Sequence, residues 1–379
     1  MLKGSILATG GAGYIGSHLA VELLAANYEV VILDNFENSD RAAAARIPRL
    51  AHGPVTLVEG DVRNTELVET ILRRHRVDAV VHLAGKKAVG ESVRDPLMYF
   101  HDNLLGALSL LRAMRAVHVN RLLFSSSATV YGTPEDLPIR ETAPTSIGSP
   151  YGRTKLMTEE IIDDVVAAQP DLRAMSLRYF NPVGAHASGL IGENPRGVPN
   201  NLFPFVAQTA AGQRNVVEVY GNDYPTEDGT GLRDYIHVVD LARGHVAALR
   251  HLMSQTSDPV RHRRINLGTG RGHTVLQVIR AFSAACGFDV PYRIVPRRPG
   301  DAAASVADAT LANELLDWHP QHSLSDMCRD HWGFQQRLAR AERPGSPILR
   351  FPQMVHAAAS SVLGGGQDRR ALHDQISPT

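Results

Sequence analysis

The chain has 379 residues, 44% of them hydrophobic and 21% charged, the usual balance of a folded enzyme with one large or two modest domains. Basic and acidic residues number 39 each and form no polybasic run, so neither a nucleic-acid partner nor a membrane partner is indicated. No apolar run reaches membrane-spanning length, no signal-peptide pattern opens the chain, and the two cysteines lack metal-ligand spacing. We therefore expect a cytoplasmic protein without a bound metal.

The first half of the sequence alternates strand-like and helix-like segments. The strand-like runs are SILAT, YEVVILD, VTLVEGD, DAVVHLAG, RLLFSSSATVYG and AMSLRYFNPVG, and helical patterns such as NTELVETILRRH lie between them. The runs are short and apolar nearly throughout, which is typical of parallel strands covered on both faces. The pattern predicts an α/β fold with a doubly wound, Rossmann-type parallel sheet.

A glycine-rich turn, GGAGYIG, follows the first predicted strand and opens a helix. Glycines at Gly10, Gly13 and Gly16 permit a tight turn, close approach of a pyrophosphate and helix–strand packing. Asp34 ends the next strand about 20 residues further on, where a carboxylate bonds the adenosine ribose and repels a 2′-phosphate. Asp61 follows the third strand at the same edge, where an adenine amino group can donate to it. These features predict an NAD site.

Three later segments place reactive side chains at the same edge. Lys87 follows the strand of VHLAGKKAVGES, the hydroxyls of Ser127 and Thr129 end LLFSSSATVYG, and SPYGRTK opens a helix with Tyr151 and Lys155 on one face. A phenol titrates near 10, but an adjacent ammonium and a positive nicotinamide both favour the phenolate. A Tyr and a Lys four residues apart occur on many ordinary helices. The neighbouring hydroxyls and the glycine turn favour a base with its tuning cation.

The amino-acid composition changes after residue 180, where Gly, Pro and Asn become frequent. The loop PVGAHASGLIGENPRGVPNNLFP is too long for a passive connector and indicates a ligand-holding region. A strand RINLGTG, a helix from Val275 to about Ala285 and a strand VPYRIVP follow. We assign the segments to an NAD-binding domain (1–180, with 236–270 returning to it), a smaller α+β substrate domain (181–235 and 271–340) and a peripheral or partly disordered tail (341–379).

These motifs together resemble the extended short-chain dehydrogenase/reductase family and, within it, the UDP-glucose 4-epimerases. The similarity runs from about residue 4 to residue 335, through GGAGYIGSHL, HLAGKKAVGESV, SSSATVYG, SPYGRTKL, RYFNPVGAH, VPNNLFP and GNDYPTEDGTGLRDYIHVVDLA. The resemblance implies an isomerase with retained NAD: Tyr151 takes the proton of the sugar 4-hydroxyl while C4 gives hydride to NAD⁺. The 4-keto sugar then turns and takes hydride back on its other face. It also implies a homodimer that pairs helices near residues 96–117 and 152–166.

The resemblance assigns roles residue by residue. Lys155 tunes Tyr151 and holds the nicotinamide ribose, Ser127 bonds the sugar oxygen, and Thr129 supports them. Further cofactor contacts implied are Tyr14, Ile15, Asn35, Asn38, Ser39, Val62, Leu83, Ala84, Gly85, Lys87, Asn103 and Phe180. On the UDP-sugar side, Arg233 and Arg298 bind the diphosphate and Tyr220 stacks on the uracil. The other substrate contacts implied are Lys87, Tyr179, Asn181, Asn201, Leu202, Asp301 and Ser305.

Two departures from the family bear on specificity. Ser305 stands where some members carry a bulky tyrosine, which leaves room for an N-acetyl group and for UDP-GlcNAc and UDP-GalNAc. Asp102, beside Asn103, differs from some relatives without an expected consequence.

Among alternative functions, a nucleotide-sugar dehydratase is disfavoured because Ala128 and Thr129 replace its Asp-Glu pair. Asp34 disfavours an NADP-dependent reductase, and the intact catalytic set disfavours a non-catalytic NAD-binding sensor.

Overall fold

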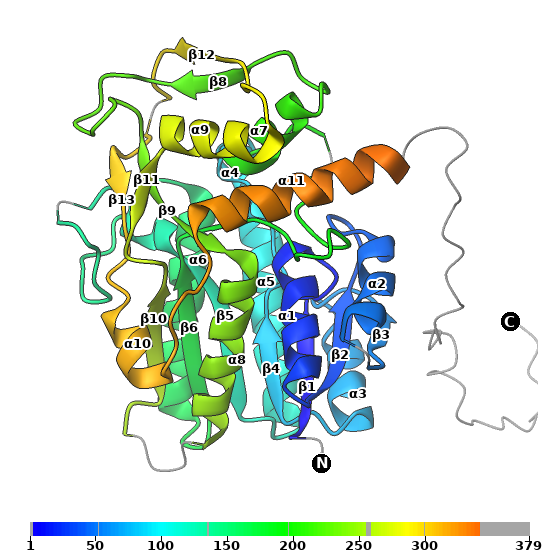
Figure 1. Cartoon of the computed structure of the whole chain (residues 1–379). Coiled ribbons are helices and arrows are strands. Elements are labelled where there is room, and N and C mark those ends of the chain that lie inside the picture. Colours follow the sequence, from blue (N-terminus) through cyan, green and yellow to red (C-terminus); the bar gives the residue numbers. More distant parts are fainter. Residues whose placement is uncertain are drawn as a thin grey trace, which may run out of the picture.

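The computed structural model describes residues 3–51, 53–134, 136–195, 197–254, 259–298 and 300–341. The tail predicted for residues 341–379 therefore lies, apart from residue 341, outside the described residues. Figure 1 shows a large sheet with helices on both faces and a smaller layer of strands and helices beyond one edge of that sheet. The beginning of the chain lies at the opposite edge.

The large sheet has seven strands in the order β10-β6-β5-β4-β1-β2-β3, and every neighbouring pair is parallel. The strands are β1 (Ser5–Thr9), β2 (Glu29–Asp34), β3 (Thr56–Glu59), β4 (Ala79–His82), β5 (Arg121–Ser127), β6 (Arg173–Tyr179) and β10 (His262–Leu267). The central strands are buried almost along their whole length, which explains their unbroken apolar runs. This sheet confirms the predicted α/β, Rossmann-type fold.

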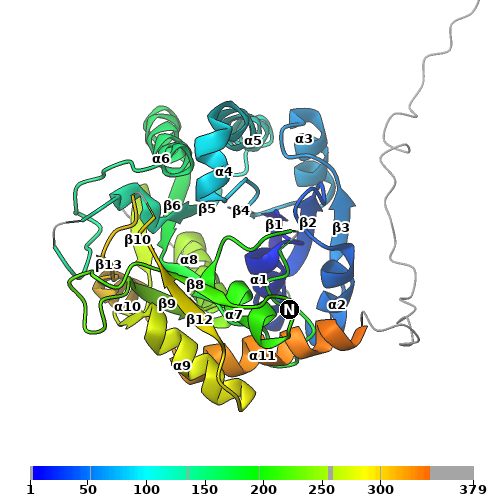
Figure 2. The same ribbon diagram turned by 90° about the horizontal axis from the view of Figure 1, so that it is seen from above.

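Helices cover the sheet on both faces, as Figure 2 shows from above. One face carries α1 (Tyr14–Ala25), α2 (Arg41–Ala51), α8 (Val238–Ser254) and α10 (Thr310–Leu316). The other carries α3 (Thr65–Arg74), α5 (Pro96–Ala116) and α6 (Pro150–Ala168), with the short α4 (Val89–Arg94) beside α5 and α6. Each face forms one continuous apolar core, so the two layers of helices fix the sheet from both sides.

The smaller layer is built from two small sheets and three helices. β7 (Asn181–Val183), β9 (Leu232–His237), β11 (Gly272–Thr274) and β13 (Ala304–Ser305) form one sheet, and β8 (Val217–Tyr220) pairs with β12 (Tyr292–Val295). The helices are α7 (Leu202–Ala210), α9 (Val275–Cys286) and α11 (Leu324–Ala341), which share an apolar core with these strands. Helix α9 begins where predicted, because Thr274 forms a capping box with Gln277.

The chain passes between the two layers more often than the predicted boundaries allow. After β9, helix α8 and strand β10 return to the large sheet, where β10 lies beside β6. The chain then crosses to the smaller layer and returns once more, because α10 and Trp318 pack in the core under the sheet. The Trp318 indole donates to the Asp240 carbonyl at 3.0 Å. Within the segment 271–340, residues 310–318 therefore pack against the large sheet.

Candidate active site

The glycine turn forms a cradle at the end of β1. Gly10 has φ +69°, and a Cβ there would lie 2.7 Å from the Ala84 nitrogen, so a side chain cannot fit. A Cβ on Gly16 would lie 2.4 Å from the Gly10 oxygen. At Gly13, the N-cap of α1, an added Cβ would contact only the Gly10 oxygen, at 3.2 Å. The open side of this cradle, at a helix N-terminus, fits the diphosphate of NAD.

Asp34 ties this cradle to the loop after β2. Its carboxylate accepts from the backbone nitrogens of Ala12 and Phe36, both at 2.9 Å, and from the Ser39 hydroxyl at 2.7 Å. Asp34 is only 7% exposed, so it is a rigid acceptor at the position predicted for the adenosine ribose. Asn38, predicted in the same contact, has an exposed side chain.

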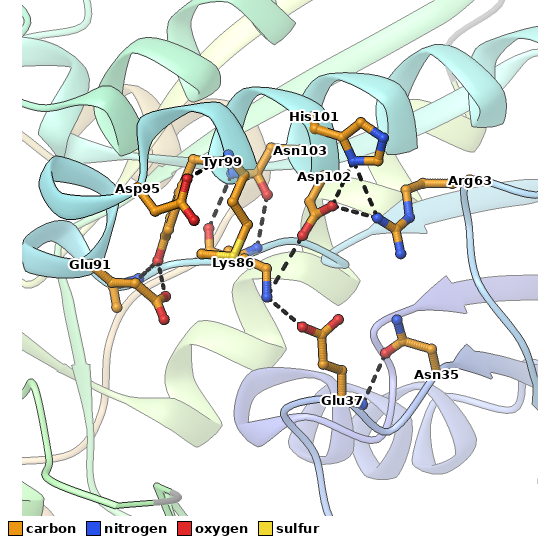
Figure 3. A network of polar contacts seen from close by, with 12 residues as sticks. Asn35, Glu37, Arg63, Lys86, Glu91, Asp95, Tyr99, His101, Asp102 and Asn103 are labelled. Atoms are coloured by element: carbon orange, nitrogen blue, oxygen red, sulfur yellow. Dashed lines mark hydrogen bonds and ion pairs between the residues drawn. The ribbon is translucent and has the colours of Figure 1, made fainter.

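Asp61 lies at the predicted edge but is already bound by an arginine that the sequence did not single out. Arg63 donates to its two oxygens at 2.9 and 2.7 Å, and Asn35 donates at 3.1 Å. Hydrogen bonding to Arg63 lowers the pKa of Asp61 to about 2. An adenine amino group here must therefore share the carboxylate with Arg63, which Figure 3 shows next to Asp102.

The predicted catalytic pair lies in the first turns of α6. Ser149 caps the helix by accepting from the Gly152 nitrogen at 3.2 Å, and Pro150 occupies its first turn. The Lys155 ammonium donates to the Ser125 carbonyl at 2.6 Å and lies 5.9 Å from the centre of the Tyr151 ring. Both side chains are buried, so the end of β5 and the start of α6 hold them in fixed positions.

The hydroxyl groups at the end of β5 complete this arrangement. The Ser127 oxygen caps the short helix η1 (Ala128–Tyr131), where it accepts from the Thr129 nitrogen at 3.2 Å and from the Thr129 hydroxyl at 3.0 Å. A hydrogen bond also links Ser127 to Tyr151. The structure thus brings together all four residues predicted to be catalytic.

Burial dominates the titration of the pair. It raises the pKa of Tyr151, and the bond to Ser127 offsets only part of this effect. Burial also lowers the pKa of Lys155 to about 8, although Glu159 favours its charged form. Burial therefore holds the pKa of Tyr151 above its ordinary value in the protein without a cofactor. The Lys155 ammonium and the positive nicotinamide remain the two charges predicted to favour the phenolate.

Asn103, a predicted cofactor contact, binds the loop after β4. Its side-chain oxygen accepts from the Lys86 nitrogen at 2.8 Å, and its amide donates to the Lys86 carbonyl at 3.1 Å and to the Thr154 hydroxyl at 3.0 Å. Both amide protons are used, so Asn103 fixes the loop that carries Gly85 and Lys87 against helix α6. Figure 3 shows these bonds between α5 and the loop.

A buried carboxylate, Glu193, joins the two layers and was not predicted. One of its oxygens accepts from the Lys87 ammonium at 3.0 Å and from the Asn201 amide at 2.8 Å. Its other oxygen is buried and has no hydrogen-bond partner among the described residues. Tyr14, whose hydroxyl donates to the Gly184 carbonyl at 2.8 Å, lies close enough for Glu193 to raise its pKa, after burial. A glutamate in a Gly- and Pro-rich loop was the only available signal.

The residues predicted for the nucleotide gather in the smaller layer. Ser305 on β13 lies directly opposite Arg233 on β9. The Arg298 guanidinium lies 4.4 Å from the centre of the Tyr220 ring and donates to Asp301 at 3.2 Å. Asn181 begins β7, which pairs with β9 beside the same edge. The structure therefore places these residues on neighbouring segments.

Two predicted ligand residues, Tyr179 and Phe180, have buried side chains. The Tyr179 hydroxyl is bonded to the His245 ring at 2.5 Å, and the whole side chain is buried. Phe180 packs in a small apolar cluster with Val130 and Tyr131. Both side chains therefore pack within the protein at the end of β6. The other predicted apolar residues are partly exposed: Ile15, Val62, Leu83, Ala84 and Leu202.

In the described part of the chain, no group of three or more His, Cys, Asp or Glu side chains could hold a metal ion. Nor is any described helix long and apolar enough to cross a membrane. A glycine cradle on a parallel sheet, with a tyrosine and a lysine at the start of a helix nearby, defines an extended short-chain dehydrogenase/reductase. The family model described as GDP-mannose 4,6 dehydratase matches residues 7–331.

Two similar relatives narrow this class. The UDP-glucose 4-epimerase of Yersinia pestis is 53% identical over 333 residues, which are 88% of this chain and 97% of that protein. The Bacillus subtilis (strain 168) enzyme of the same name is 50% identical, over 87% and 96% of the two chains. This chain belongs to the UDP-glucose 4-epimerase family, as the sequence motifs predicted.

Solved structures agree with this assignment. The UDP-glucose-4-epimerase of Stenotrophomonas maltophila, crystallised with NAD and formylated UDP-arabinopyranose, matches with a TM-score of 0.86 and 51% identity, over 89% of this chain and 99% of that one. The Bifidobacterium longum enzyme, in complex with NAD⁺ and UDP, matches with a TM-score of 0.83 and 48% identity, over 88% and 98%.

Proposed function

We propose that this protein is an NAD-dependent UDP-sugar 4-epimerase, an isomerase that interconverts UDP-glucose and UDP-galactose. The carrying observation is that Tyr151, Lys155 and Ser127 meet next to a cradle that fits NAD, while Arg233 and Tyr220 lie in the layer beyond. An epimerisation at one sugar carbon requires separate catalytic and nucleotide-binding regions, because the diphosphate and uracil must be held while the sugar ring turns.

The residues of the chain have separate tasks in this reaction. NAD, when bound, supplies a reversible hydride acceptor for sugar C4. Tyr151 takes the proton of the 4-hydroxyl and later returns it. The Ser127 hydroxyl holds that 4-hydroxyl in place by a hydrogen bond. Lys155, fixed on the Ser125 carbonyl, keeps a positive charge beside the phenol. Their burial excludes water from the reacting atoms.

The site favours epimerisation over dehydration. Expelling a sugar hydroxyl requires an acid beside the base, yet the residues after Ser127 are Ala128 and Thr129. The dehydratase activity named by the family model is therefore not proposed for this chain.

To test the epimerase function, the protein is incubated with UDP-galactose without added cofactor, and the nucleotide sugars are resolved by chromatography. UDP-glucose is expected. A 4-keto-6-deoxy product would establish a dehydratase, and no product even with NAD would refute the epimerase function.

The pocket also accepts N-acetylated sugars, because Ser305 is small and lies opposite Arg233. Conversion of UDP-GalNAc to UDP-GlcNAc is therefore expected alongside that of UDP-galactose. In Ser305→Tyr, conversion of UDP-GalNAc should be lost while that of UDP-galactose continues. Ser305→Ala is the matched control, since it keeps the space. A wild-type enzyme that converts UDP-galactose alone would refute the argument from pocket size.

The protein forms a homodimer through α5 and α6. Apolar side chains stand exposed along α4 and α5, with Leu97 79% exposed and Val89, Val93 and Leu108 at 37–62%. Such an exposed apolar stripe is typical of a protein interface. Light scattering should give twice the chain mass, and Leu97→Asp should yield monomers.

The two cysteines, Cys286 and Cys328, are free thiols, which supports the proposed cytoplasmic location.

A further inference from the structure

A chain of ion pairs connects four segments at the carboxyl edge of the large sheet. The Lys86 ammonium lies 2.5 Å from a Glu37 oxygen and 3.6 Å from an Asp102 oxygen. Asp102 also accepts from Arg63, which in turn holds Asp61. Figure 3 shows this chain running from the loop after β2, through Lys86, to helix α5 and the loop after β3.

The strand order places the Glu37–Lys86 pair across the glycine cradle. β1 lies between β4 and β2 in the sheet. Lys86 follows β4 and Glu37 follows β2, so their side chains meet over the loop that leaves β1. That loop is the glycine turn, and Asp34, the predicted ribose acceptor, is three residues before Glu37. A dinucleotide lying along this edge passes the same position.

Both ends of the bridge are anchored in the backbone. Asn103 binds the nitrogen and the carbonyl of Lys86, at 2.8 and 3.1 Å. The Glu37 nitrogen donates to the Asn35 side chain at 3.0 Å. Burial works against the charge of Lys86, but the bond to Glu37 and the negative charges of Glu37, Asp102 and Glu91 together outweigh this effect and raise the pKa of Lys86. Lys86 therefore stays charged at neutral pH, and the pair joins two fixed points.

We propose that Glu37 and Lys86 form a clasp that closes the adenosine side of the NAD site and slows the release of the cofactor. They are positioning residues: separating the loops after β2 and β4 breaks the pair, and NAD leaves only when those loops separate. This inference rests on the proposed NAD-dependent function. The Glu37 side chain is 54% exposed, so the pair adds little to the stability of the whole protein. Its effect belongs to the release rate.

The experiment measures NAD release directly, without a sugar. Protein loaded with isotopically labelled NAD is mixed with excess unlabelled NAD, and the label still bound is followed by rapid filtration. Lys86→Met should release NAD about two- to fivefold faster than the wild type, because the lost ion pair is partly exposed. Glu37→Gln should have the same effect, and the double variant should be no faster than either single one. Lys86→Arg, which keeps the charge, should retain slow release.

Salt provides a readout that a merely structural role would not change. At about 1 M salt the difference between wild type and Lys86→Met should shrink, because exposed charges are screened over about 3 Å. Lys3→Met is the matched control: Lys3 is exposed just before β1, at the opposite edge of the sheet, and its loss should leave release unchanged. Turnover with saturating NAD should be the same in all variants.

The possible failures can be told apart. A folded Lys86→Met variant that releases NAD at the wild-type rate would overturn the clasp and leave the epimerase function intact. Additive effects of Glu37→Gln and Lys86→Met would also overturn it, since partners in one pair cannot act independently. A wild-type protein that binds no NAD would overturn the proposed function first, and the clasp with it.

Discussion

Replacing the buried lysine of the catalytic pair should stabilise the protein while abolishing its activity. Burial lowers the pKa of Lys155 from its ordinary 10.5 to about 8. At 1.36 kcal/mol per pKa unit, keeping the charged ammonium buried at pH 7 costs roughly 3 kcal/mol. Lys155→Met removes that cost but leaves the Ser125 carbonyl without its donor, which costs about 1–3 kcal/mol. The cofactor-free variant should therefore be about 0–2 kcal/mol more stable than wild type at pH 7.

The pH dependence gives the sharper test. Between pH 8 and 10.5 the folded wild type has released the Lys155 proton while the unfolded chain still holds it, so the free energy of unfolding rises with pH. Lys155→Met lacks this rise. Urea unfolding of both NAD-free proteins at pH 7 and pH 10 should show the wild type gaining roughly 2–3 kcal/mol on the variant. Equal slopes, together with a variant that is less stable at pH 7, would refute the claim that burial strains Lys155.

Three further predictions concern other buried groups. Tyr151→Phe should lower epimerisation about 10²–10⁴-fold, measured by chromatography, with the NAD content of the purified protein unchanged. Arg178→Met removes the main partner of the fully buried Glu159 and should cost roughly 3 kcal/mol of unfolding free energy, while the double change with Glu159→Gln should recover part of it. Burial lowers the pKa of His331 from 6.5 to about 4, so the urea midpoint should fall as pH drops from 6.5 towards 4. That fall should be smaller in His331→Phe, since the ring lies among aromatic side chains.

The parts of the site that the sequence predicted are those set by local geometry. A glycine turn after an apolar strand has one common structural use, and the cradle around Gly10 and Gly16 follows directly from it. Tyr151 and Lys155 share a helix face whatever packs against it, because their spacing is one turn. Parallel strands bring their ends to one edge, so the hydroxyl of Ser127 could be placed beside them.

The residues that were missed depend on contacts between distant segments. Lys86 and Glu37 are 49 positions apart, and Lys87 and Glu193 are 106 apart. Periodicity reports which face of an element is buried, but it does not report which loops meet. The same limit applies to the hydrogen bonds of a residue predicted to contact the substrate. Tyr179 ends a strand next to the site, yet its hydroxyl is satisfied by His245 on a helix that returns much later in the chain.

The pKa shifts of Tyr151 and Lys155 show that the residue types in a site do not determine their protonation states. The sequence supplies a phenol and an ammonium one turn apart, and in water that ammonium would favour the phenolate. In the folded chain both groups are desolvated, so Tyr151 is held protonated and Lys155 loses part of its preference for charge. A neutral phenol is a poor base. The protein without cofactor is therefore not poised to take a proton, and a further positive charge is needed beside the ring. Oxidised nicotinamide carries that charge and its reduced form does not, so the strength of the base follows the redox state of the bound cofactor.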